Sequence, residues 1–432
     1  MNGELAGHWR NHPRRGEEFQ YNEGWPRSAA ARPLSLSLPF TPDNAPYRGA
    51  TARTYFDNLL PDSEPLRKRL QSKFKAPSTD PFDLLGEIGR DCVGAVQILP
   101  EGQAPERLFE IRGEPLDEAG VERALERAVS APGPGHSEDD DLRISIAGAQ
   151  EKTALLMHEG RWQRPLGTTP STHILKLPLG AVGNRQVDLS TSVENEWLCL
   201  RLLAAYGLPV ARADIATFGA KKALVLERFD RKLADDGRWW MRIPQEDFCQ
   251  ATSTPPALKY EAHGGPGMER ILRLLEQSSR RDADRQTFYR AQILFWMLAA
   301  PDGHAKNFSI FLEAGGSYRL TPLYDVVSAW PVSGEGPNQI DRYKVKLAMA
   351  VRGKNVHYLM RDILRRHWNE TARRAGLGAD AEPLIGELVG AAPRVVDVVS
   401  RDLPAGFPAS VADPIFLGLI DSARRLEAMS PR

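Results

Sequence analysis

The alternation of apolar and polar positions is strongest between about residues 143 and 230, where it predicts a series of strands. The turn Gly219-Ala220-Lys221 separates the last two runs and predicts a hairpin. The strand-like runs are Thr153–Met157, Ile174–Leu177, Ile215–Phe218 and Ala223–Leu226. This part of the chain is therefore expected to form a β-rich lobe.

A single helix interrupts these strands, and both of its ends are marked in the sequence. Thr191 and Glu194 have the spacing of a capping box at its start, and Gly207 is expected to end it. From Met268 onward the periodicity is mostly helical, apart from a hairpin near residues 308–324. A helical lobe is therefore expected after the β-rich one.

The first hundred residues predict a small α+β module ahead of these lobes. A helical stretch is expected near Phe56–Phe74, and Pro81–Leu85 indicates a helix that leads into a buried strand at Val93–Leu99. The loop-like run Ala131–Ser137, followed by the acidic residues Glu138–Asp141, is expected to separate this module from the rest.

Composition and charge exclude several classes of protein. Of the 432 residues, 42% are hydrophobic and 26% are charged, which is ordinary for a globular chain of about two to four domains. Lys plus Arg and Asp plus Glu both total 56, so no net positive charge draws the chain to nucleic acid or membrane. Three widely spaced cysteines and the lack of a membrane-length apolar stretch predict a cytoplasmic protein that contacts no membrane.

Lys176 lies inside the apolar run Ile174–Leu177, where its ammonium group must meet an anion or extend to solvent. Glu196, on the helix that follows, shares a face with Leu200 and is the expected partner of Lys176. A strand lysine followed by a helix glutamate is the order in which kinases hold a phosphate-contacting lysine. Glu194 is a competing partner, and an edge-strand lysine that extends to solvent is the alternative.

Asp302 and Asn307 form the most informative pair in the chain. They follow an apolar helical run, and Pro301 predicts that this helix stops at Ala300 and leaves Asp302 on a loop. Kinases use the same spacing for an aspartate that accepts the substrate hydroxyl proton and an asparagine that binds magnesium. An Asp-Gly turn with a capping asparagine is the alternative on local pattern alone.

A hairpin is expected directly after this loop, because apolar runs flank Gly315-Gly316. A turn centred there puts Asn307 almost opposite Asp325 at the open end of the hairpin. Amide and carboxylate oxygens suit Mg²⁺, so this pair predicts a magnesium site. In the same loop, His304 either orients the chain or meets substrate, and Lys306 either neutralises a phosphate or faces solvent.

Small residues at Ala147, Gly148 and Ala149 permit a tight turn whose backbone amides could approach phosphates. The turn matches neither the dinucleotide-binding glycine motif nor the Walker lysine loop. On local pattern alone, an ordinary hairpin turn is the commoner interpretation.

The chain resembles the HipA family of serine/threonine kinases, the toxin half of bacterial toxin–antitoxin pairs, in motifs that occur in this order: SIAGAQEKTALL, ILKLP, VENEW, LERFDR, PQEDFCQA, DGHAKNFSIF and LTPLYDVVS. The resemblance implies an α+β, two-lobed protein-kinase-like fold. Its β-rich N-terminal lobe carries an extra N-terminal subdomain, and its C-terminal lobe is mainly α-helical. The expected domains are residues 1–110, 111–254 and 255–432.

By position, the resemblance implies an ATP- and Mg²⁺-dependent kinase with Asp302 as catalytic base and His304 in the same catalytic loop. Asn307 and Asp325 would bind the magnesium ion. ATP would be held by Ala147, Gly148, Ala149, Lys152, Lys176, Lys306 and the hinge residues Glu227, Arg228 and Phe229. Ser145 would be the serine that family members autophosphorylate to inactivate themselves, because added negative charge in a phosphate-binding turn repels ATP.

The resemblance also implies partners. The expected target is glutamyl-tRNA synthetase, whose phosphorylation would inhibit translation and cause growth arrest and persistence. The expected antitoxin is a HipB-like helix-turn-helix protein, which would supply most of the base contacts when the pair represses its operator DNA. Two alternatives stay open: a catalytically idle, nucleotide-binding subunit of a repressor complex, and a small-molecule kinase. The segment Gln250–Gly267 would either line the acceptor cleft of such a kinase or form an ordinary turn-rich connector.

Overall fold

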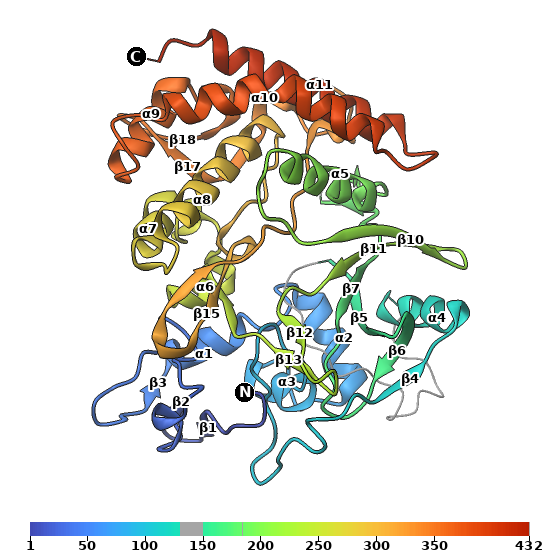
Figure 1. The fold of residues 1–432 in the computed structure, drawn as a ribbon, viewed down its shortest axis with the longest axis vertical. Coiled ribbons are helices and arrows are strands. Elements are labelled where there is room, and N and C mark those ends of the chain that lie inside the picture. The colour runs from blue at the N-terminus through green and yellow to red at the C-terminus, as the bar shows by residue number, and fades with distance from the viewer. Residues whose placement is uncertain (130–149, 184, 432) are drawn as a thin grey trace. The chain divides into compact units, whose positions relative to one another are not determined.

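The computed structural model describes residues 1–129, 150–183 and 185–431 of the chain (Figure 1). The chain divides into two compact units, and each is described by itself. The first unit comprises Met1–Leu177, Ala216–Ala257 and Ser309–Tyr318, and the second comprises Pro178–Ile215, Leu258–Phe308 and Arg319–Arg432. The three-domain division expected from the sequence stays a prediction.

The first unit begins with a three-stranded antiparallel sheet and three helices that share one apolar core. The strands are β1 (Gly7–His12), β2 (Gly16–Tyr21) and β3 (Tyr47–Arg48), and the helices are α1 (Ala50–Asp57), α2 (Glu64–Phe74) and α3 (Pro81–Ile88). Trp9 stacks on Phe56 with ring centroids 3.9 Å apart, and Phe19 and Tyr21 lie in the same core. The small N-terminal α+β module expected from the sequence is present.

One sequence prediction for this module is confirmed in part and another is wrong. The helical stretch expected near Phe56–Phe74 is the end of α1 followed by α2, and Pro61, which cannot continue a helix, lies in the break between them. No strand is found among the described residues of the segment Val93–Leu99. Side chains fix this segment instead: Gly94, with a φ of 75°, donates its N–H to the carboxylate of Asp230 at 2.7 Å.

A six-stranded sheet forms the centre of the first unit, with the strand order β10-β11-β7-β5-β6-β4. Its strands are β4 (Gly113–Pro115), β5 (Lys152–His158), β6 (Arg161–Pro165), β7 (His173–Lys176), β10 (Ala213–Phe218) and β11 (Lys221–Glu227). Helix α4 (Glu118–Val129) packs on one face, where Val121 and Leu125 meet Leu155 and Leu175. The strands and the β10–β11 hairpin expected from the alternation are confirmed.

The hairpin expected after the Asp302 loop is also confirmed. Gly315 and Gly316 both have positive φ angles, 80° and 86°, which glycine adopts without strain. The N–H of Glu313 donates to the carbonyl of Ser317 at 2.8 Å. The hairpin and its neighbours are β12 (Arg231–Leu233), β13 (Trp240–Arg242), β14 (Gln245–Asp247), α6 (Phe248–Ala251), β15 (Ser309–Leu312) and β16 (Tyr318–Leu320).

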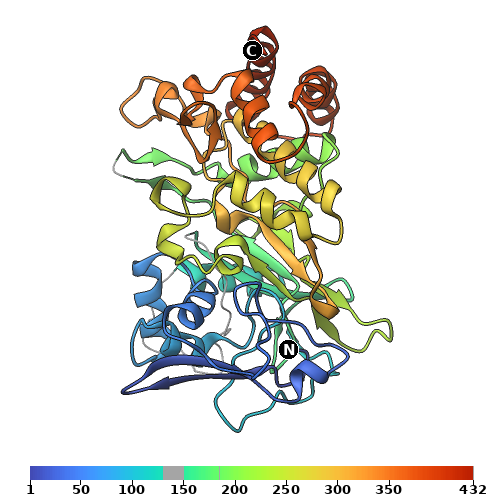
Figure 2. The same cartoon turned by 90° about the vertical axis from the view of Figure 1, so that its left-hand side faces the viewer.

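The second unit is mainly helical, as expected. Its elements are β8 (Ala181–Val182), β9 (Val187–Asp188), α5 (Ser192–Ala205), α7 (Met268–Leu274), α8 (Arg281–Met297), β17 (Lys346–Arg352), β18 (Val356–Leu359), α9 (Arg365–Arg374), α10 (Glu382–Arg401) and α11 (Ala409–Ala428). Helices α10 and α11 pack side by side and both contact α8 (Figures 1 and 2). Over the residues that the structure describes, no helix has both the length and the apolar character needed to span a membrane.

Two details of this unit differ from the sequence predictions. The β17–β18 hairpin was not expected. Thr191 is the N-cap residue of α5, but its side chain makes no capping hydrogen bond, so the expected capping box with Glu194 is wrong. The helix is buried along most of its length, and this packing stabilises it in place of the cap.

Candidate active site

The loop that carries Asp302 leaves the end of α8, whose last turns are buried. The helix ends at Met297 rather than at Ala300, because Ala299 has a left-handed conformation with a φ of 49°. The predicted helix end is therefore late by one turn. Pro301 follows the helix end instead of causing it.

The carboxylate of Asp302 is open to solvent but held on one side. Its side chain is 56% exposed, so a substrate hydroxyl can reach it. The hydroxyl of Tyr260 donates a hydrogen bond to Oδ1, and Nε2 of the buried His304 lies 3.7 Å from the same oxygen. The rings of Tyr260 and His304 meet edge to face, with centroids 5.0 Å apart. Two neighbours thus orient the carboxylate while it stays accessible.

Asn307 closes the loop back onto Asp302. Its Nδ2 donates to the backbone carbonyl of Asp302 at 2.7 Å, and its backbone N–H donates to the carbonyl of His304 at 2.9 Å. This orientation uses the amide nitrogen and leaves Oδ1 as the atom suited to a cation. Gly303 lies so close to Phe295 that a Cβ atom would come within 2.5 Å of the ring, so the loop requires glycine there.

Asp325 follows β16, and the residue before it contacts the loop. The hydroxyl of Tyr324 donates to the carbonyl of Lys306, beside Asn307, at 2.9 Å. The expected pairing of Asn307 with Asp325 stays a prediction. Asp325 itself has a φ of 58°, a conformation that non-glycine residues adopt rarely and that is concentrated at functional sites.

Tyr260 is a site residue whose role the sequence did not reveal. It lies in the Gln250–Gly267 connector, and the carbonyl of its neighbour Lys259 accepts the N–H of Ala305 at 3.3 Å. Tyr260 and Asp302 are 42 positions apart, so no local pattern reports their contact. The one indication of its role in the sequence was its location in Gln250–Gly267, the turn-rich segment named above as a possible lining of the acceptor cleft.

Lys176 occupies a central strand of the large sheet and is only 7% exposed. Lys152 on β5 lies directly opposite Lys176 in the strand register, so both side chains project from the same face. The adjacent Leu175 packs in the core beneath α4, which places the two lysines on the opposite face of the sheet. A central, buried position excludes the alternative of an edge-strand lysine that extends to solvent.

Glu196 and Glu194, the expected partners of Lys176, lie on α5 and are 2% and 3% exposed. They belong to the second unit, whereas Lys176 belongs to the first. The Lys176–Glu196 ion pair therefore stays a prediction.

The expected hinge contains a residue with a clear structural task. The backbone N–H of Arg228 donates to the carbonyl of Thr172 at 2.8 Å, so it is already used in the fold. Its buried guanidinium donates to both carboxylate oxygens of Asp230, at 3.0 and 2.9 Å, and to the hydroxyl of Ser171 at 2.9 Å. Arg228 thus fixes the end of β11, next to Glu227 and Phe229.

This arginine belongs to a buried charge network in the first unit. Asp91 lies 2.8 Å from Arg231, 3.3 Å from Arg228 and 3.6 Å from Arg242. Burial alone would raise the pKa of Asp91, but the three guanidinium groups hold that pKa well below its ordinary value. Burial lowers the pKa of Arg242 to about 10, so this guanidinium stays charged at neutral pH. The network anchors the hinge to the N-terminal module.

Other expected site residues, namely Ser145, Ala147, Gly148 and Ala149, lie outside the described residues. Within the described part of the chain, no cluster of three or more His, Cys, Asp or Glu side chains is placed to hold a metal. The expected magnesium site has only two protein ligands, one amide and one carboxylate, so it is too small to count as such a cluster. Such a small set suits Mg²⁺, which usually keeps water and phosphate oxygens as its other ligands.

A buried strand lysine in a β-rich unit and an aspartate–asparagine loop in a helical unit define a fold of the kinase class. Two family models match the chain: the HipA N-terminal domain over residues 1–99 and the HipA-like C-terminal domain over residues 144–396. The chain belongs to the HipA family of serine/threonine kinases, and ATP is the phosphate donor that such an enzyme uses.

The relatives agree with this assignment. The chain is 35% identical to Y4mE of Sinorhizobium fredii, a protein named as a kinase, over 364 residues that cover 83% of this chain and 81% of Y4mE. It is 28% identical to the serine/threonine-protein kinase toxin HipA of Shewanella oneidensis, over 77% of this chain and 72% of the toxin.

A solved structure of the Shewanella oneidensis HipA, in complex with HipB and operator DNA, matches the whole chain. The TM-score is 0.78 at 25% sequence identity, and the match covers 99% of this chain and 96% of that HipA. The family, the α+β kinase-like fold and the kinase activity expected from the sequence are therefore confirmed.

Proposed function

We propose that the protein transfers the γ-phosphoryl group of ATP to a serine hydroxyl of a protein substrate by in-line displacement. The observation that carries the proposal is the geometry of Asp302, which is exposed, oriented by Tyr260 and bonded through its carbonyl to Asn307. Phosphoryl transfer depends mainly on positioning and on neutralisation of charge, and this loop provides fixed groups for both.

Asp302 acts as the base in this proposal. Its accessible carboxylate oxygen accepts the proton of the substrate hydroxyl as the new oxygen–phosphorus bond forms. Tyr260 and His304 are positioning residues, because they contact Oδ1 and limit rotation of the carboxylate. Lys306 is buried in the same loop and is proposed to place its ammonium group beside the transferred phosphate.

The residues of the site fit a magnesium ion. Asn307 offers Oδ1 because its Nδ2 is already bonded to Asp302, and Asp325 offers a carboxylate from a backbone conformation that is costly without a function. Bound Mg²⁺ would neutralise the phosphate oxygens of ATP. The chain supplies two hard oxygen ligands, which is the usual protein share for this ion.

For ATP itself we propose Lys176 and Lys152 as phosphate contacts, since both project from the same face of the sheet. Ala147, Gly148 and Ala149, which precede β5 in the sequence, are proposed as further contacts of the phosphates. At the hinge, adenine would meet backbone groups of Glu227 and Phe229, because the N–H of Arg228 is bonded to Thr172.

We further propose a toxin role with a HipB-like antitoxin, and repression of operator DNA through that complex. The similarity to the Shewanella oneidensis HipA, solved with HipB and operator DNA, supports this assembly. Glutamyl-tRNA synthetase is the proposed target and Ser145 the proposed autophosphorylation site, both by family resemblance. A cytoplasmic location follows from such a target.

The test is transfer of label from ATP with Mg²⁺ to the protein alone and to glutamyl-tRNA synthetase, followed by mass spectrometry. Label on Ser145 and on the synthetase, absent with Asp302→Asn, would support the kinase reaction, its base, its target and its autophosphorylation site. Label on Ser145 alone would keep the kinase and reject the target. No label on either, from folded protein that binds ATP, would identify an idle regulatory subunit.

A further inference from the structure

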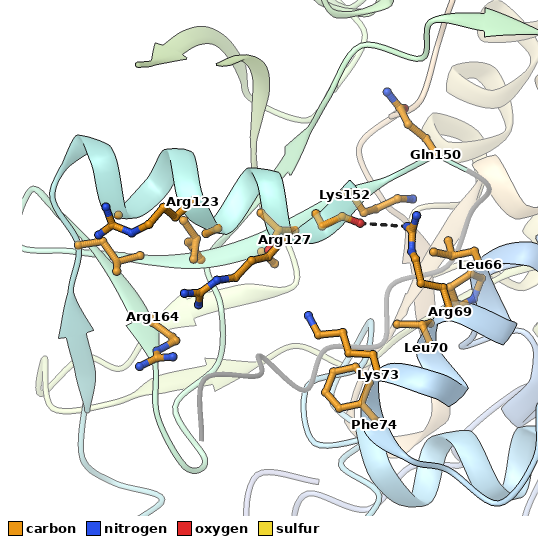
Figure 3. A pocket seen from close by; sticks show the side chains of 18 of the residues that line it. Leu66, Arg69, Leu70, Lys73, Phe74, Arg123, Arg127, Gln150, Lys152 and Arg164 are labelled. Carbon is orange, nitrogen blue, oxygen red and sulfur yellow. Dashed lines mark hydrogen bonds between the residues drawn. The ribbon is translucent and has the colours of Figure 1, made fainter. Parts of the chain in front are cut away.

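A cavity of about 220 Å³ lies within the first unit, between α2 on one side and α4 with strands β5 and β6 on the other (Figure 3). None of the family's expected catalytic-loop or hinge residues lines it. Of the expected ATP contacts that the structure describes, only Lys152 does. The catalytic loop and the hinge therefore do not account for this cavity.

The lining of this cavity is strongly cationic. Its basic side chains are Arg69, Lys73, Arg123, Arg127, Lys152 and Arg164. Among the residues that the structure describes, one carboxylate, that of Glu114, also lines the cavity. The cations come from the four elements α2, α4, β5 and β6 (Figure 3), so the fold, rather than one helix, brings them together. Like charges around a small space repel one another, and an anion relieves that repulsion.

Three of the arginines have partners among the described residues. Arg69 is paired with Glu151 and donates to the carbonyl of Ala128 at 2.9 Å, and Arg164 is paired with Glu114. Arg123 lies 4.0 Å from Asp117.

By contrast, the guanidinium of Arg127 makes no ion pair or hydrogen bond with any residue that the structure describes, although it is only partly exposed. A guanidinium in such a position is suited to bind a phosphate with two parallel hydrogen bonds.

The lining also includes large apolar side chains. These are Leu66, Leu70 and Phe74 of α2 and Leu155 of β5, and Lys73 lies over the ring of Phe74 with its Nζ 5.5 Å from the centroid. The cavity therefore combines basic and apolar side chains. Its volume is below the range of about 300–1,000 Å³ typical for drug-sized ligands, which limits the occupant to a small molecule.

We propose that this cavity binds a small phosphate monoester that carries an apolar ring. Arg127, Arg123 and Lys73 contact the phosphate, and the leucines and Phe74 contact the ring. The assignment does not depend on the kinase reaction, because Lys176 and the catalytic loop do not line the cavity. The chemical class is defined by the two kinds of side chain that meet there.

The test is isothermal titration of the full-length protein with phenyl phosphate, with inorganic phosphate as the second probe. The ATP site is first saturated with a non-hydrolysable ATP analogue and Mg²⁺. We expect one phenyl phosphate per chain, bound roughly tenfold more tightly than inorganic phosphate because the ring is removed from water.

Variants locate the bound phosphate. Arg127→Gln should weaken binding roughly tenfold, since it removes a charge-assisted contact. It should leave folding unchanged, because Arg127 has no partner within the described part of the chain. Lys73→Gln should weaken binding as well. The matched control is Arg394→Gln, which removes an exposed helical arginine outside the cavity and should bind like the unmodified protein.

Four results would overturn the proposal. The first is no binding of phenyl phosphate to the unmodified protein. The second is equal binding by the unmodified protein, Arg127→Gln and Lys73→Gln. The third is loss of binding in Lys176→Met, which would place the probe at the ATP face. The fourth is equal affinities for phenyl phosphate and inorganic phosphate, which would refute contact between the ring and the apolar side chains.

Discussion

Glu246 on β14 gives the protein a pH dependence of stability that can be calculated from the structure. The side chain is fully buried, and Oε1 accepts the N–H of Leu36 at 2.8 Å. Oε2 has no hydrogen-bond partner among the described residues. Burial raises the pKa of Glu246 from 4.5 to about 8, so the group is mostly protonated in the folded protein at neutral pH.

The sign of the effect follows from proton binding. Between pH 4.5 and about 8 the folded protein keeps a proton that the unfolded chain has lost, so the free energy of unfolding falls as pH rises. The shift from 4.5 to about 8, at about 1.4 kcal/mol per pH unit, gives a loss of roughly 5 kcal/mol across this window. Glu246→Gln removes the titrating group and keeps an oxygen for Leu36.

The assay is urea unfolding of both proteins from pH 5 to pH 9. The other titrating groups are common to the two proteins, so the difference between their unfolding free energies isolates Glu246. We expect Glu246→Gln to gain stability relative to the unmodified protein as pH rises, by up to about 5 kcal/mol. A difference that stays constant with pH would refute the buried, protonated carboxyl group.

Three further variants test the site. Asp302→Asn should reduce phosphoryl transfer roughly 10²- to 10⁴-fold in a label-transfer assay while ATP binding stays unchanged; unchanged transfer would reject the base. Tyr260→Phe should lower kcat about tenfold with little change in the KM for ATP, since it frees Asp302 to rotate; an effect on KM alone would contradict this. Arg228→Met should destabilise folding by about 3–5 kcal/mol in urea unfolding, because Asp91 and Asp230 lose a buried partner; a near-neutral result would contradict the anchoring role.

The sequence predicts those parts of the site that depend on local order. Asp302 and Asn307 share one loop, and the glycine pair at Gly315-Gly316 forms the turn of the predicted hairpin. Lys176 was identifiable because a lysine is unusual in an apolar strand. Short-range patterns such as these can be recognised from the sequence, because chain connectivity alone brings the residues together.

Contacts between distant segments could not be predicted in this way. Tyr260 reaches Asp302 across 42 positions, and Arg228 reaches Asp91 across 137, and neither pair has a sequence signature. The cationic cavity combines residues of four elements, and sequence periodicity does not specify how these elements pack together.

Two errors in secondary structure have local causes. The β17–β18 hairpin was missed because a short apolar run such as Lys346–Arg352 has no period that separates a strand from a buried helix. The Val93–Leu99 strand was expected from the same kind of run. There, Gly94 and a buried carboxylate impose a different backbone path.

The central claim is that Asp302 is the base of a magnesium- and ATP-dependent protein kinase. The most direct measurement is the initial rate of label transfer from ATP to protein serine by the unmodified protein, Asp302→Asn and the matched control Asp282→Asn, an exposed aspartate at the start of α8. The account predicts transfer by the unmodified protein and by Asp282→Asn, and loss of at least about a hundredfold in Asp302→Asn. Equal rates in all three proteins would contradict it.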